Sequence, residues 1–234
     1  MKILALDTTA KTATAAVLED EKLLGIYTVN TENTHSETLL PMIKSLLSSL
    51  SLDVQAIDAF AVSIGPGSFT GVRIGVATVK GLAFGTGKKC IGVDTIDALY
   101  ENLSDFSGIV CPVMNARRGQ VYCGLFDGGE KIIPSSCMEL DELIRIAEER
   151  AKKENKKIFF VGDGYELCLG KDVYGFEPTP ELLVYQNAYS VGKIAYRKIT
   201  AGEDTKDTEL EINYIRKPQA EREREEKMKN EAAK

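Results

Sequence analysis

The sequence predicts an α/β protein of two lobes, each built around a mixed β-sheet. Strand-like runs alternate with helical patterns along most of its 234 residues, which is typical of α/β folds. In addition, an apolar strand, a polar bend and a returning strand occur twice, and Asn115 in the second copy stands in the place of Asp7 in the first. The expected lobes are residues 1–103 and 104–217, followed by a charged tail at 218–234.

The first lobe is expected to open with three antiparallel strands. An apolar run at residues 3–6 ends in Asp7, residues 8–11 form a polar turn, and strand-compatible residues resume at 12–18. A third strand follows at 22–30, after an acidic turn. The result is a meander with a carboxylate at its first bend.

Two helices and two further strands complete this lobe. Residues 34–37, Thr-His-Ser-Glu, have the sequence of a capping box, and leucines then recur at helical spacing. Strands are expected at 59–64 and 90–93, with a nearly uncharged helix at 72–85 between them. Strands and helices therefore alternate as a crossover connection requires.

The second lobe contains the same kinds of element. After the repeated strand, bend and strand, a charged amphipathic helix is expected at 141–155 and a strand at 157–161. A Gly-Asp-Gly turn at 162–164 follows that strand. A final helix at 188–200 could pack back on the first lobe.

Composition excludes several classes of protein. With 35 acidic and 29 basic residues, the net charge of −6 argues against holding nucleic acid by bulk phosphate neutralisation alone. No apolar stretch approaches the roughly 20 residues of a membrane span, and no signal peptide is expected, so a cytoplasmic protein without membrane contact is predicted. Five cysteines without a close pair favour buried, reduced thiols over one reactive thiol. The single histidine, His35, rules out a histidine-pair metal site and is expected at the surface or in a helix cap.

The glycine-rich loop at 65–71 stands between a strand and a helix. Backbone N–H groups and the helix dipole can receive an anion at such a place. The loop is not a P-loop, because the Gly-Lys-Ser/Thr ending of that motif is absent. The alternative is a tight turn whose glycines let the helix start close to the sheet.

The string Ser-Ile-Gly-Pro-Gly-Ser-Phe-Thr-Gly-Val-Arg-Ile-Gly at residues 63–75 resembles the signature of the bacterial TsaB family, also called YeaZ. Further landmarks follow the family's order: Leu-Ala-Leu-Asp-Thr-Thr at 4–9, His-Ser-Glu at 35–37 and Asn-Tyr-Ile-Arg at 213–216. The resemblance spans residues 1 to about 218. It implies a two-lobed fold of the actin, Hsp70 and sugar-kinase (ASKHA) type, made of two RNase H-like sub-domains.

The resemblance also implies a role in making N6-threonylcarbamoyladenosine at position 37 of tRNAs. In that pathway a TsaB-like subunit pairs with its paralogue TsaD, which performs the transfer from threonylcarbamoyl-AMP, and the P-loop ATPase TsaE joins them. The chain is therefore expected to be a non-catalytic scaffold or activating subunit, and no enzyme by itself. It is expected to meet tRNA indirectly and to form a homodimer when alone.

The residues at the two bends argue against catalysis independently of the family resemblance. ATPases of this fold need carboxylates at both bends to hold hydrated Mg²⁺. Here Asp7 qualifies, but its counterpart is Asn115, and the neighbouring Arg117 disfavours a metal while tolerating a phosphate or carboxylate. One-sided metal binding is therefore the expectation.

A nucleotide could still touch these bends. No tightly bound cofactor is expected, although ATP or ADP could bind at a site shared within the complex. Asp7 has an alternative role, as an acceptor for hydrogen bonds from its own turn. The candidate nucleotide or anion contacts are Asp7, Thr8, Thr9, Lys11, Asn115 and Arg117.

The two helices of the first lobe are candidates for a partner surface. Glycines punctuate the second helix, each costing about 1 kcal/mol relative to alanine, and close approach of another element would offset that cost. Both helices could instead be buried only within this chain, but the resemblance favours pairing. The candidate interface residues are Leu39, Ile43, Leu46, Leu47, Arg73, Gly75, Val76, Ala77 and Lys80.

Two other functions remain open from the sequence. One is a nucleotide-dependent small-molecule kinase of the same fold, against which Asn115 argues. The other is a stand-alone homodimeric binding module, which predicts no stable complex with a TsaD-like chain.

Overall fold

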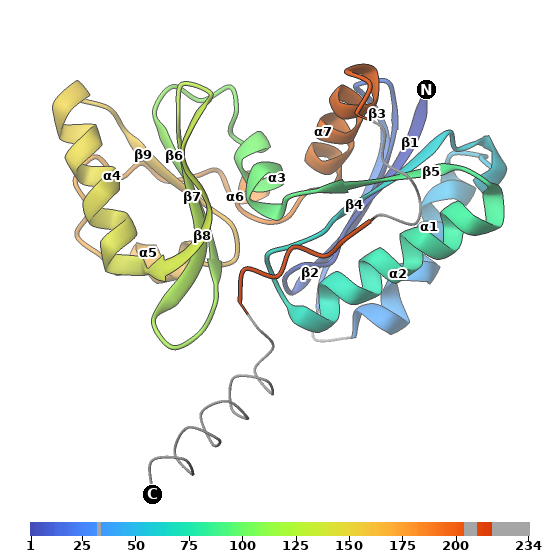
Figure 1. Ribbon diagram of the computed structural model, residues 1–234, viewed down its shortest axis with the longest axis horizontal. Coiled ribbons are helices and arrows are strands. Elements are labelled where there is room, and N and C mark those ends of the chain that lie inside the picture. The colour runs from blue at the N-terminus through green and yellow to red at the C-terminus, as the bar shows by residue number, and fades with distance from the viewer. Residues whose placement is uncertain (32–33, 204–209, 217–234) are drawn as a thin grey trace, which may run out of the picture.

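The computed structural model describes residues 1–31, 34–203 and 210–216. These residues form two lobes that lie side by side, each with its own β-sheet (Figure 1). The charged tail predicted at 218–234 lies outside the described residues.

The first sheet has five strands in the order β3-β2-β1-β4-β5. β1, β2 and β3 pair antiparallel, whereas β4 is parallel to β1 and β5 is parallel to β4. The predicted meander is therefore confirmed. The strands are β1 Lys2–Asp7, β2 Thr12–Glu19, β3 Lys22–Asn30, β4 Ala59–Ser63 and β5 Lys89–Val93.

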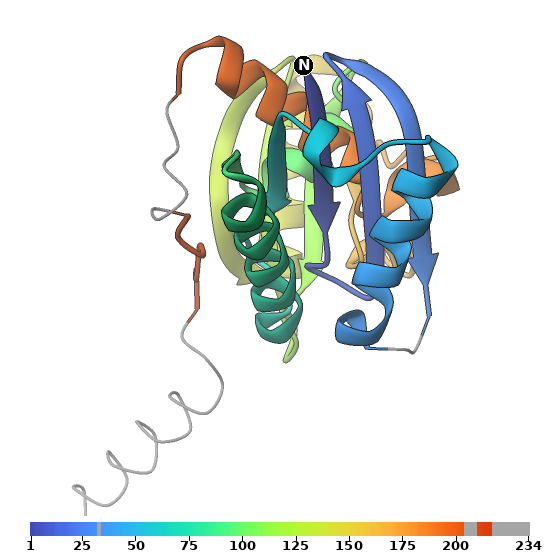
Figure 2. The ribbon, with the colours of Figure 1, turned by 90° about the vertical axis from the view of Figure 1, so that its right-hand side faces the viewer.

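Two helices cover one face of this sheet (Figure 2). They are α1 (His35–Ser49) and α2 (Phe69–Thr86), and a 3-10 turn, η1 (Val54–Ala56), precedes β4. Their apolar side chains join the strands in one core. The predicted capping box at the start of α1 does not form in full. The Thr34 hydroxyl donates to the Glu37 carboxylate (2.9 Å) and makes no hydrogen bond to the helix backbone.

The second sheet has the same pattern of strand pairing as the first, with one strand fewer. Its order is β8-β7-β6-β9, with β6, β7 and β8 antiparallel and β9 parallel to β6. The predicted fold class, two RNase H-like sub-domains in an ASKHA-type arrangement, is confirmed. The elements are β6 Ile109–Asn115, β7 Gln120–Asp127, β8 Glu130–Glu139, α4 Leu140–Glu154, β9 Ile158–Val161, α5 Tyr165–Leu169 and α6 Glu181–Val184.

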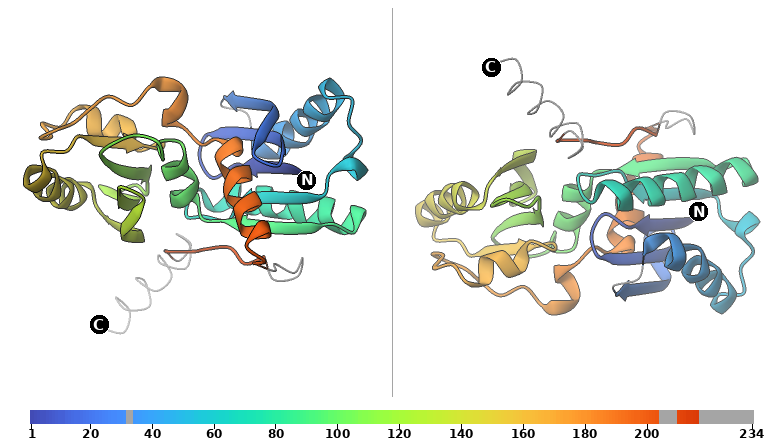
Figure 3. Two further views of the ribbon diagram at one scale, coloured as in Figure 1. Left: turned by 90° about the horizontal axis from the view of Figure 1, so that it is seen from above. Right: turned by 90° about the horizontal axis from the view of Figure 1, so that it is seen from below.

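Two helices tie the lobes together. α7 (Ala188–Thr200) has the bounds predicted from the sequence and packs on the opposite face of the first sheet from α1 and α2 (Figure 3). α3 (Thr95–Glu101) packs Ile96 and Leu99 against apolar residues of the second sheet. Glu101 at the end of α3 is buried and pairs with Arg197 of α7 at 2.9 and 3.0 Å, so α3 is fixed to both lobes.

The last described segment, residues 210–216, also returns to the first lobe. Leu210 is buried in the core under α1 and α2, and the backbone N–H of Asn213 donates to the carbonyl of Ile64 at 2.8 Å. Among the described helices, none is both long and apolar enough to cross a membrane.

Candidate functional site

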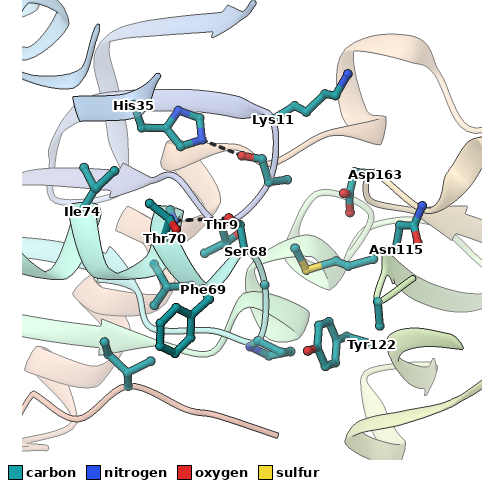
Figure 4. Close-up of a pocket in the computed structure, with 18 of the residues that line it drawn as sticks. Thr9, Lys11, His35, Ser68, Phe69, Thr70, Ile74, Asn115, Tyr122 and Asp163 are labelled. Atoms are coloured by element: carbon teal, nitrogen blue, oxygen red, sulfur yellow. Dashed lines mark hydrogen bonds between the residues drawn. The ribbon is translucent and has the colours of Figure 1, made fainter. Parts of the chain in front are cut away.

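A cavity of about 820 Å³ lies between the two lobes. Its walls come from the β1–β2 turn, the starts of α1 and α2, the β6–β7 turn and residues 212–216. Figure 4 shows Thr9 and His35 on the first-lobe side, and Asn115 and Asp163 on the second-lobe side. Four of the six predicted nucleotide or anion contacts line this cavity: Thr9, Lys11, Asn115 and Arg117.

Asp7 is sealed beneath the cavity wall. Its side chain accepts hydrogen bonds from the Thr9 N–H (2.8 Å), the Thr9 hydroxyl (2.7 Å) and the Ser63 hydroxyl (2.5 Å). Burial raises the pKa of the Asp7 carboxyl, although these hydrogen bonds oppose the rise. Thr8 is also buried and donates to the Gly71 carbonyl at 2.7 Å. Asp7 and Thr8 therefore do not line the cavity, and Asp7 accepts hydrogen bonds from its own turn.

Asn115 repeats the arrangement of Asp7 in the second lobe. Its Oδ1 accepts from the Arg117 N–H at 2.8 Å, as Asp7 Oδ1 accepts from the N–H of Thr9. Arg117 and Arg118 have φ angles of 64° and 55°, a left-handed conformation that costs non-glycine residues roughly 1–2 kcal/mol each. The bend therefore holds a strained pair of arginines at the end of β6.

Asp163 is a second carboxylate that sequence reasoning gave little weight. It lines the cavity in the Gly-Asp-Gly turn after β9, and its Oδ1 is buried without a hydrogen-bond partner among the described residues. Burial raises the pKa of Asp163 to about 6, although hydrogen bonds from the backbone of Asn115 and of Asp163 itself oppose the rise. The acid between two glycines directly after a strand was the available signal, but such turns are common.

The glycines of the 65–71 loop allow the close approach of α2 to the β1–β2 turn. A Cβ on Gly67 would lie 2.5 Å from the Thr9 carbonyl oxygen, and a Cβ on Gly71 would lie 2.0 Å from the Thr8 carbonyl oxygen. Neither distance is possible for a real side chain. The tight-turn interpretation of this loop is confirmed.

Residues 210–216 pass next to the loop at 65–71. The Arg73 guanidinium lies 3.7 Å from the centre of the Phe69 ring, and its Nε donates to the Tyr214 hydroxyl at 2.9 Å. Arg216 reaches the second lobe, where its Nη1 donates to the Ala116 carbonyl at 3.0 Å. His35 also faces the cavity, with its Nε2 2.7 Å from the Ala10 carbonyl oxygen (Figure 4).

The predicted partner surface divides into a buried and an accessible part. The buried residues belong to this chain's own core, because the apolar stripes of α1 and α2 face the first sheet. Six of the predicted interface residues are buried in this way: Leu39, Ile43, Leu46, Leu47, Gly75 and Val76. A Cβ on Gly75 would lie 2.6 Å from the Thr8 hydroxyl, so that glycine serves packing inside the chain.

The accessible part lies on the outer face of α2. Arg73 and Ala77 are exposed and Lys80 is half-buried. Two exposed apolar residues that the sequence analysis did not select lie on the same helices: Phe84 on α2, which is 90% exposed, and Leu40 on α1. Helical spacing alone could have placed Phe84 with Ala77, seven residues earlier.

The described residues contain no group of three or more histidine, cysteine, aspartate or glutamate side chains that could hold a metal ion. Four of the five cysteines are buried, and burial raises the pKa of Cys123 and Cys168 to about 12. These two thiols therefore remain protonated at neutral pH.

Two RNase H-like lobes around a cavity define a protein of the actin and sugar-kinase class, here with one sealed carboxylate and one amide at its two bends. Residues 11–200 match the family model described as TsaD, tRNA N6-adenosine threonylcarbamoyltransferase. The chain is 33% identical over 166 residues to the tRNA threonylcarbamoyladenosine biosynthesis protein TsaB of Bacillus subtilis, covering 69% of this chain and 71% of the relative. It is 30% identical over 178 residues to the protein of that name in Escherichia coli, covering 74% and 76%.

A solved structure agrees with these sequence relatives. YeaZ from Pseudomonas aeruginosa superposes with a TM-score of 0.72 at 25% identity, covering 91% of this chain and 99% of that chain. The chain belongs to the TsaB family, also called YeaZ.

Proposed function

We propose that this chain is a non-catalytic scaffolding and activating subunit of the assembly that transfers a threonylcarbamoyl group from threonylcarbamoyl-AMP to N6 of adenosine 37 in tRNAs. Its relatives in Bacillus subtilis and Escherichia coli are named as threonylcarbamoyladenosine biosynthesis proteins. The matching family model is named for the transferase itself. The transfer chemistry then belongs to a TsaD-type partner, and this chain contributes a surface that binds it.

The observation that carries this proposal is the outer face of α2. Arg73, Ala77, Gly81 and Phe84 recur at intervals of four, four and three residues, so they share one side of the helix. A Cβ at Gly81 would meet nothing within 4 Å, which leaves room for another backbone. A phenylalanine that is 90% exposed on such a low-relief face is typical of a protein contact site.

The bends of the two lobes support a role without catalysis. Hydrated Mg²⁺ needs accessible carboxylate oxygens, and those of Asp7 are occupied by hydrogen bonds from Thr9 and Ser63. Asn115 offers an amide oxygen that already accepts from Arg117. These contacts argue against the small-molecule kinase alternative.

The proposed partners follow from this division of labour. A TsaD-type paralogue binds the α2 face, a TsaE-type P-loop ATPase joins the pair, and tRNA is held mainly by the partners because this chain carries a net charge of −6. When alone, the chain forms a homodimer through the same face. ATP or ADP binds at a site shared within the complex. This site includes the cavity residues of this chain.

Reconstitution tests the proposed role. With TsaD-type and TsaE-type proteins, threonylcarbamoyl-AMP and tRNA present, we expect modified adenosine 37 only when this chain is added. The chain alone should neither modify tRNA nor hydrolyse ATP at a rate near the ~1 per second of a slow ordinary enzyme. Modification that proceeds equally well without this chain, or rapid ATP hydrolysis by the chain alone, would show that the proposal is wrong.

A further inference from the structure

We propose that the cavity between the lobes binds a phosphate-bearing small molecule of nucleotide size without a divalent cation, and that Arg117 and Arg216 supply the positive charge. This inference deepens the nucleotide contact proposed above and rests on it. It concerns how the site holds its ligand, which the fold class alone does not decide.

The oxygen donors at the two bends do not suit a divalent metal. Mg²⁺ keeps a nearly octahedral set of oxygen ligands and is usually anchored by one or two carboxylates. Both carboxylate oxygens of Asp7 accept hydrogen bonds within the first lobe, and the residue is only 1% exposed. Asn115 Oδ1 accepts from Arg117, and the described residues hold no cluster of acidic or histidine side chains that could replace these ligands.

The charge of the cavity is opposite to that of the whole chain. The chain carries a net charge of −6. Among the described residues that line the cavity, however, the charged side chains are three cations, Lys11, Arg117 and Arg216, and one acid, Asp163. An anionic ligand is the partner that this lining favours.

Arg216 is held beside the bend that carries Arg117. Nη1 of Arg216 donates to the carbonyl of Ala116, which directly precedes Arg117. Arg117 is fixed in a left-handed conformation by the bond from its N–H to Asn115. A phosphate that accepts hydrogen bonds from both guanidinium groups would form charge-assisted contacts, which are stronger than neutral ones.

The remaining lining fits the rest of a nucleotide-sized molecule. A volume of about 820 Å³ lies within the range of small-molecule sites, roughly 300–1,000 Å³. Asp163, on the second-lobe side, has a buried oxygen without a partner, which suits a hydroxyl or amine donor better than a phosphate. We therefore expect Asp163 to contact a hydroxyl or amine of the ligand, and Arg117 and Arg216 to contact its phosphates.

Calorimetric titration of the full chain tests this inference, with ADP, tripolyphosphate and adenosine as probes. In buffer with EDTA we expect ADP and tripolyphosphate to bind, and adenosine to bind far more weakly. Adding Mg²⁺ should weaken both phosphate probes, because the metal competes with the arginines for the same oxygens. Binding of either phosphate probe only when Mg²⁺ is present would overturn the inference, as would no binding of both.

Adjacent arginines give a matched pair of variants. Arg117→Gly removes a cavity side chain and suits the φ of 64°, whereas Arg118→Gly makes the same change at φ 55° in a residue that does not line the cavity. At equal ionic strength, we expect Arg117→Gly to weaken ADP binding about ten-fold or more. We expect Arg118→Gly to weaken it less than three-fold. Arg216→Ala should resemble Arg117→Gly. Equal effects of the two glycine variants would overturn the assignment.

The assay separates this inference from the proposed function. Ligand binding is measured on the chain alone, whereas the subunit role is measured with a TsaD-type partner. A chain that pairs with its partner but binds no phosphate probe contradicts only the inference. A chain that binds ADP without metal but does not pair contradicts the subunit role and leaves the arginine site standing.

Discussion

Asp7 and Asn115 occupy equivalent places in the two lobes, and neither presents an unoccupied side-chain oxygen to the cavity. The sequence predicted their equivalence, because each follows an apolar strand. It could not predict that Ser63, 56 residues further along the chain, would seal Asp7. Residue type alone therefore did not show that Asp7 is buried, and it gave little weight to Asp163, which lines the cavity.

Asp163 makes the stability of the chain depend on pH. Burial raises its pKa from 3.8 to about 6, so the folded chain binds this proton more tightly than the unfolded chain. The stabilisation is complete below pH 3.8 and is lost as the pH rises through 6. Asp163→Asn should therefore be more stable than the wild type above pH 7, by at most about 3 kcal/mol, with no difference near pH 4. Urea unfolding of both proteins across this range measures the effect, and a constant difference would contradict the assigned shift.

At the scale of elements, α2 carries both cavity residues and the proposed partner face. The sequence predicted a helix from residue 72, but the helix begins at Phe69 because the Ser68 hydroxyl accepts from the Gly71 N–H at 3.3 Å. β8 was not predicted, since Pro134 and the charged residues at its ends disfavour a strand, yet the edge of a sheet tolerates proline. Local patterns identified most elements, and contacts between elements decided their ends.

The glycines of α2 have two different roles, which a pair of alanine substitutions distinguishes. Gly71→Ala places a Cβ against the Thr8 carbonyl and should destabilise the fold by more than about 2 kcal/mol. Gly81→Ala meets nothing within 4 Å and should stabilise the monomer by roughly 0.5–1 kcal/mol, because alanine favours helix. Thermal melts of the two variants provide the comparison. Similar melting temperatures for both would contradict the packing role of Gly71.

At the scale of the whole molecule, one carboxylate joins three distant parts of the chain. Asp94 caps α3, accepts from the Ser135 hydroxyl of β8 at 2.8 Å, and accepts from the Asn213 side chain at 3.0 Å. Such contacts span up to 119 residues and leave no periodic signal in the sequence. For this reason the sequence predicted two lobes but could not predict that residues 210–216 return to the first.

Truncations at the C-terminus measure the contribution of that segment. A chain ending at residue 218 keeps the contacts of Leu210, Asn213 and Arg216, and its melting temperature should stay within about 4 °C of the full chain. A chain ending at residue 209 loses a buried leucine and two hydrogen bonds that cross the molecule. Its melting temperature should fall by more than about 4 °C. Equal melting temperatures for both truncations would contradict a structural role for residues 210–216.

The proposed subunit role depends on the outer face of α2, and substitutions there should separate binding from folding. Ala77 is exposed, so Ala77→Glu should leave the circular dichroism melt unchanged while placing a charge where another chain approaches. Phe84→Ala should weaken association at least ten-fold, because it removes the largest exposed apolar side chain of the face. Leu182→Ala is the matched control, since Leu182 is 92% exposed but lies on α6.

The proposed subunit role is tested most directly by size-exclusion chromatography with light scattering. The sample is the chain mixed with a TsaD-type protein. We expect the wild type and Leu182→Ala to elute with the partner at the mass of a complex, and Ala77→Glu to elute separately from it while remaining folded. A wild-type chain that never enters a complex, or a folded Ala77→Glu variant that enters it as readily as the wild type, would contradict the central claim.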